Sequence, residues 1–140
     1  MQSRRHFAGV GAAIALAFCT DSFAYEPATN YALHCMGCHT PDGAGIADRV
    51  PSIRDTLLLF ARMPEGRRFL VQVPGSAQST LSDAELAKLL NWMVRTLGAS
   101  ARADSFVAFT EREVTEYRVT PLLEVRATRE ALLRASRERP

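Results

Sequence analysis

The strongest pattern of hydrophobic and polar positions lies in residues 80–98, TLSDAELAKLLNWMVRTLG. Its apolar side chains recur every three or four residues, which is the spacing of one face of an α-helix. These side chains are Leu86, Leu89, Leu90, Met93 and Leu97. Ser82 is a favourable N-cap, and Glu85, three residues later, completes a capping box. Because Gly98 is typical of a helix end, the pattern predicts one long amphipathic helix.

Three shorter segments before this helix also have helical character. Residues 27–39 predict a short helix that starts with a proline and runs into the sequence HCMGCHT. Residues 53–63 predict a second helix, which we expect to stop at Pro64 and Gly66. Residues 67–73, RRFLVQV, predict a third short helix.

The remaining segments complete the prediction of fold class. Residues 40–52 contain two glycines, two prolines and two aspartates, and so predict a loop. In residues 99–140, Thr110 and Glu113 form a second capping box, and a final helix is expected after Pro121. Because no segment alternates apolar and polar residues as a strand does, we predict an all-α fold.

The first residues predict export of the chain. Arg4 and Arg5 precede an apolar stretch from Phe7 to Phe18, and Ser22–Ala24 is a small-x-small cleavage site. Residues 1–24 therefore read as a cleaved signal peptide, with the periplasm as the destination. The alternative is an uncleaved N-terminal anchor, although the apolar stretch is shorter than the ~20 residues that a membrane span needs.

Composition and charge limit the possible functions of the chain without identifying one. The chain has 140 residues, of which 47% are hydrophobic and 23% are charged, as expected for a small globular protein. Its formal net charge of +2 is too small to indicate binding to nucleic acid.

The chemistry of the chain is concentrated in Cys35, Cys38 and His39. C-x-x-C-H is the attachment pattern of haem c. The two thiols add to the two vinyl groups of the porphyrin, and helix residues three positions apart share a face. The histidine then presents its imidazole to the iron. We therefore predict one covalent haem c with Cys35 and Cys38 as its anchors and His39 as a metal ligand.

Two other interpretations of the motif are weaker. A thioredoxin-like dithiol also has C-x-x-C, but it follows a βαβ pattern that this sequence lacks. A zinc site needs four ligands, and Cys35, Cys38 and His39 supply three. His34 is a poor fourth ligand because it stands directly beside the others.

Around this motif, residues 31–51 resemble the N-terminal half of a monohaem class I c-type cytochrome. The shared features are an aromatic residue before the motif, the sequence DGAG and a later proline. The resemblance implies that the carbonyl of Pro51 accepts a hydrogen bond from His39. It also implies that Trp92 packs on the haem, because the sequence LSDAELAKLLNWMV is similar to the last core helix of that family.

The resemblance implies two parts of the mature chain and leaves the distal ligand of the iron unassigned. It covers residues 25–98 as a cytochrome c domain, and residues 99–140 are then a helical C-terminal extension. In the family, a methionine followed by proline usually binds the far side of the iron, but here Val73 precedes the proline.

Several groups remain as the distal ligand of the iron. Met63 is our expected ligand, because it also precedes a proline. Met93 is an alternative within the long helix, and His34, His6 or an external group are further ones. The position can also be open, with Val73 over the iron.

As a whole, the resemblance implies an electron-transfer protein, which is not itself an enzyme. A periplasmic dehydrogenase is the expected electron donor, and another cytochrome or a terminal oxidase is the expected acceptor. Arg67 and Arg68 can pair with the haem propionates or simply be solvated. An open iron position would instead give a haem-based module that binds or senses small ligands. A third possibility is a haem subunit docked to a dehydrogenase through residues 99–140.

Overall fold

The computed structural model describes residues 24–98 and 105–138. In these residues the chain forms seven helices and no strand, apart from an isolated bridge between Ile46 and Val50. The predicted all-α fold class is therefore confirmed for the described part. The predicted signal peptide lies outside the described residues except for its last position. None of the described helices is both long and apolar enough to cross a membrane.

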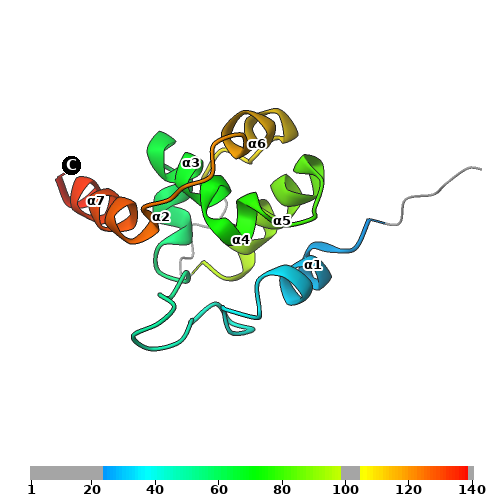
Figure 1. Ribbon diagram of the computed structural model, residues 1–140, viewed down its shortest axis with the longest axis horizontal. Helices are drawn as coiled ribbons and strands as arrows, with labels where there is room; N and C mark the ends of the chain where they lie inside the picture. Colours follow the sequence, from blue (N-terminus) through cyan, green and yellow to red (C-terminus); the bar gives the residue numbers. More distant parts are fainter. Residues whose placement is uncertain (1–23, 99–104, 139–140) are drawn as a thin grey trace, which may run out of the picture.

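Helix α5 (Asp83–Thr96) is the central element (Figure 1). It packs against α1 (Pro27–His34), α2 (Leu57–Ala61) and α6 (Glu111–Arg118). The predicted apolar face is buried as expected, at Leu86, Leu89, Leu90 and Met93. The first capping box is also confirmed, because Ser82 Oγ accepts from the backbone N–H of Glu85 while the Glu85 carboxylate accepts from the N–H of Ser82.

The predicted helix over residues 53–63 is wrong in its bounds. The structure has a shorter α2, and α3 (Pro64–Gln72) begins at the proline that we expected to stop the preceding helix. Met63, between them, adopts extended backbone with φ −103° and ψ 130°. Proline suits the first position of a helix, where its missing N–H is not needed. A further short helix, α4 (Pro74–Ala77), was not predicted.

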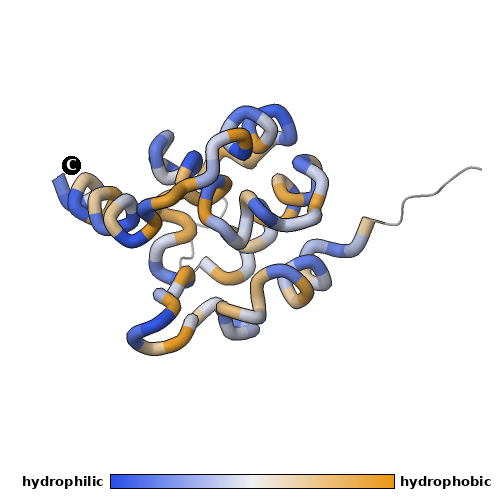
Figure 2. Tube along the Cα trace, viewed as in Figure 1, coloured by the Kyte–Doolittle hydropathy of each residue, from blue (hydrophilic) through white to orange (hydrophobic). Residues whose placement is uncertain are grey.

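The C-terminal extension folds onto the rest of the protein through α6 and α7 (Val125–Glu138). Arg67 Nε donates to the Glu113 carboxylate at 2.6 Å, and Arg118 Nη1 donates to the Asp83 carboxylate at 2.9 Å. Asn91 exchanges two hydrogen bonds with the backbone of Phe109. Figure 2 shows that the surface helix α6 consists mainly of hydrophilic residues, so polar contacts carry much of its attachment.

Gly66 allows α3 to approach the end of α2. A Cβ at this position would lie 2.4 Å from the carbonyl oxygen of Phe60 and 2.7 Å from its Cα, whereas one at Gly75 would meet nothing within 4 Å. We expect Gly66→Ala to lower the free energy of unfolding by about 1–3 kcal/mol, because backbone atoms must move apart. The matched variant Gly75→Ala should leave stability unchanged or slightly higher. Urea unfolding measures both, and equal stability of the two variants would contradict the close approach.

Candidate cofactor site

The motif lies in a turn directly after α1, which corrects the predicted helix through residue 39. The helix ends at His34. The carbonyl of Cys35 then accepts hydrogen bonds from the N–H of Cys38 at 3.1 Å and from the N–H of His39 at 2.9 Å. These two bonds fold the motif into one tight turn, so the three-residue spacing still brings both cysteines and the histidine to the same site.

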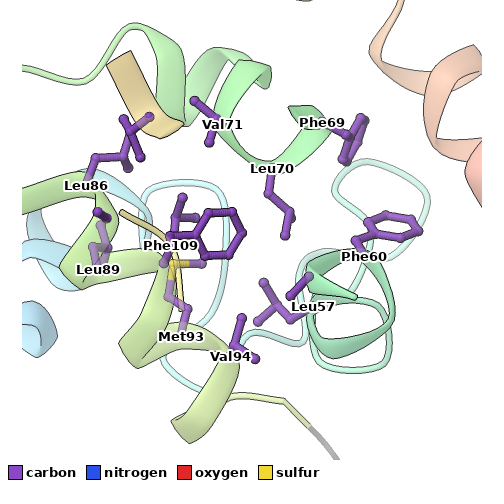
Figure 3. Close-up of a cluster of buried hydrophobic side chains, with 14 of the residues drawn as sticks. Leu57, Phe60, Phe69, Leu70, Val71, Leu86, Leu89, Met93, Val94 and Phe109 are labelled. Atoms are coloured by element: carbon purple, nitrogen blue, oxygen red, sulfur yellow. The ribbon is translucent and has the colours of Figure 1, made fainter. Parts of the chain in front are cut away.

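Cys35, Cys38 and His39 line one cavity of about 310 Å³. This volume is at the lower end of the roughly 300–1,000 Å³ that small-molecule pockets occupy. Apolar side chains from α2, α3 and α5 form its wall, and Figure 3 shows several of them turned toward a common centre. These side chains include Leu57, Phe60, Leu70, Leu86, Leu89, Leu90 and Met93.

His39 has the properties of a neutral ligand. Burial lowers the pKa of its imidazole below the usual value, which favours the neutral form that binds metals. Its Nδ1 is buried and has no hydrogen-bond partner in the described protein. The expected bond to the carbonyl of Pro51 is therefore not formed, although Pro51 lines the same cavity. A buried nitrogen without a partner is costly, and this fits a site that a bound group completes.

The two cysteines are free thiols, and their surroundings differ. Cys38 is exposed, whereas Cys35 is half buried. Burial, and then the neighbouring Cys38, raises the pKa of the Cys35 thiol to about 11. Cys35 is therefore protonated at neutral pH.

The loop after the motif brings Pro51 to the cavity. Tyr31 Oη donates to the carbonyl of Thr40 at 2.7 Å and fixes the start of the loop on α1. Gly45 has φ +77°, and a Cβ there would lie 2.3 Å from the carbonyl oxygen of Val50. Only glycine fits this close return of the chain, which explains one glycine of the DGAG sequence.

Met63 is not at the cavity, contrary to our expectation for the distal ligand. Its side chain is 4% exposed in the core, and it does not line the cavity. Among the described methionines only Met93 lines it, and Val73 and His34 line it as well. His6 lies outside the described residues.

Three other predicted contacts to a haem also find different partners. Trp92 does not line the cavity; its ring lies 5.6 Å from that of Tyr31, where α1 crosses α5. Arg67 is engaged by Glu113, and Arg68 stacks 4.8 Å from the ring centroid of Tyr117. Both arginines therefore support α6, and neither lines the cavity.

The structure adds cavity residues that the sequence did not reveal. Arg49 comes from the loop after the motif, and Val125 and Arg129 come from α7. No local signal in the sequence connects α7 with the motif, because the contact depends on how the extension folds back. Among the residues that the structure describes, no three His, Cys, Asp or Glu side chains are grouped so that they could hold a metal ion.

Comparison with models of known protein families gives no match, and a search of curated proteins finds none with significant similarity.

The difference between the two thiols predicts unequal alkylation of the free chain. The thiolate is the reactive form, and a pKa of about 11 leaves about one Cys35 in a thousand ionised at pH 8. We expect Cys35, studied in Cys38→Ser, to react slowly with iodoacetamide. Its rate should rise about tenfold per pH unit up to about pH 11. The raised pKa should largely persist in that variant, because burial is its main cause.

Two controls define the result of this alkylation experiment. The denatured chain should react with the pH dependence of an ordinary cysteine, and Cys38 in Cys35→Ser should react faster than Cys35 does because it is exposed. If the alkylation rate of Cys35 is the same in the folded and the denatured chain, the result would contradict the burial of this thiol.

Proposed function

We propose that this protein is an exported monohaem c-type cytochrome that transfers single electrons. The observation that supports it most is that Cys35, Cys38 and His39, the complete C-x-x-C-H pattern, line one apolar cavity. The all-α fold agrees with the resemblance to class I cytochromes, and the reduced thiols and neutral imidazole agree with the required chemistry.

The residues of the chain have distinct roles in this proposal. If haem binds, each thiol would add its sulfur and its hydrogen across one vinyl double bond, so attachment would consume no oxidant or reductant. His39 would supply an imidazole nitrogen to the iron from the turn after α1. The leucines of α5 exclude water from the site. Haem iron supplies the one-electron chemistry, since it is stable in both the ferric and the ferrous state.

The proposed partners follow from export and from one-electron chemistry. A periplasmic dehydrogenase is the donor in this proposal, and another cytochrome or a terminal oxidase is the acceptor. A second candidate function is the binding of a small ligand such as CO or NO at an open iron position. The observation that favours it is that Val73, which has no donor atom, lines the cavity while Met63 does not.

Covalent attachment of haem tests the proposed function directly. We expect the full-length chain, produced in a host that matures c-type cytochromes, to keep haem after denaturation, as seen by its mass and by haem staining. Cys35→Ala with Cys38→Ala should abolish this attachment. Met36→Ala is the matched control, because Met36 lies within the motif but does not line the cavity. An exported wild-type chain without covalent haem would overturn the proposal.

Replacing Met93 and Met63 in turn distinguishes an electron carrier from a protein that binds a small ligand at the iron. If a methionine binds the iron it is Met93, so Met93→Ala should remove the weak far-red absorption band of ferric Met–iron coordination and permit rapid CO binding. Met63→Ala should keep the band but lower stability by about 2–5 kcal/mol, because it leaves a cavity in the core. If the wild-type protein lacks this absorption band and binds CO rapidly, the result would contradict Met93 coordination and support the second candidate function.

A further inference from the structure

Two arginines from distant parts of the chain line the edge of the cofactor cavity. Arg49 belongs to the loop after the motif, and Arg129 belongs to α7. Both also line a wider groove of about 690 Å³ between this loop and α7, so they lie where the cavity meets the groove. No aspartate or glutamate of the described chain lines the cavity itself. Its apolar interior therefore has a positively charged edge.

These two arginines differ from the arginines that hold the scaffold together. Arg54, Arg67 and Arg118 each form an ion pair with a carboxylate of the protein. Within the described residues, Arg49 and Arg129 form none. Arg129 Nη2 donates one hydrogen bond, to the carbonyl of Ser52 at 3.4 Å.

Their unused donors indicate the chemical class of the partner. A guanidinium group has five N–H donors, arranged to bind a carboxylate through two parallel bonds. Asp48 and Glu130 line the wider groove but make no ion pair with either arginine. A cavity occupant with carboxylate groups at one edge would accept hydrogen bonds from both Arg49 and Arg129.

We propose that Arg49 and Arg129 bind the two propionate carboxylates of the haem, and that α7 is therefore part of the haem site. This inference rests on the proposed function. It gives the C-terminal extension a role within the cytochrome, because α7 supplies Arg129 and, one turn earlier, the cavity-lining Val125. It also replaces Arg67 and Arg68, which the sequence had suggested for this role.

The reduction potential of the full-length holoprotein tests this assignment. A positive charge near the iron favours the state with one more electron, so Arg129→Gln should lower the potential. We expect a decrease of up to tenfold in the ratio of reduced to oxidised protein at a fixed applied potential, which is 59 mV for one electron. Resonance Raman bands of the propionate groups should shift in the same variant, and Arg129→Lys should restore most of the potential because it keeps the charge.

The matched control is Arg126→Gln. Arg126 lies on the same helix and carries the same charge, but it lines only the wider groove. We expect this variant to change the ratio by less than twofold and to leave the propionate bands in place. Arg49→Gln should behave like Arg129→Gln, and it provides the decisive measurement if circular dichroism shows that Arg129→Gln does not fold.

The possible outcomes separate this inference from the proposed function. Covalent haem with equal potentials and unchanged propionate bands in Arg129→Gln, Arg49→Gln and Arg126→Gln would overturn the role of the two arginines and leave the cytochrome proposal standing. Absence of covalent haem in the wild-type protein would overturn both. A shift in the potential and propionate bands of Arg129→Gln or Arg49→Gln, absent from Arg126→Gln, would support both.

Discussion

The packing of α5 against three other helices is the constraint on which the rest of the structure depends. One side of α5 presents Leu86, Leu89, Leu90 and Met93 to the cavity. A second side places Trp92 against Tyr31 of α1, which directly precedes the motif. A third side uses the amide of Asn91 to hold the backbone of Phe109. The same helix therefore lines the cavity, packs against the helix before the motif and contacts the C-terminal extension.

The arginine contacts of the extension follow from this arrangement. Arg118 donates to the carbonyls of Ala77, Ser79 and Leu81 as well as to Asp83, so it satisfies backbone acceptors at the end of α4 and in the segment before α5. The side chains of Arg67 and Glu113 are only 12% and 18% exposed. Removing one member of such a partly buried pair is costly, because the other charge loses its partner. These contacts fix α6 on the domain, and the chain that continues from α6 carries α7 to the edge of the cavity.

Local signals in the sequence predicted the structure well, and signals that depend on distant partners did not. The capping box at Ser82 formed as predicted because both of its partners lie within three residues. The box at Thr110 formed only in part: Thr110 accepts from the N–H of Glu113, but the Glu113 carboxylate binds Arg67 instead. The signal from proline was ambiguous, since we expected Pro64 to stop a helix, whereas α2 already ends at Ala61 and Pro64 begins α3. A local pattern also could not reveal that Arg129 reaches the cavity.

The position of Met63 has the same physical origin and bears on the proposed chemistry. A methionine before proline resembles a distal ligand in sequence, but here Pro64 starts α3 and Met63 belongs to the core. In the proposed holoprotein, three features then act on the iron in one direction. Apolar walls would disfavour the more highly charged ferric state, a thioether ligand from Met93 would also favour the ferrous state, and two arginines at the edge would stabilise the added electron. Together they would raise the reduction potential, as suits the proposed transfer of electrons from a dehydrogenase to a stronger oxidant.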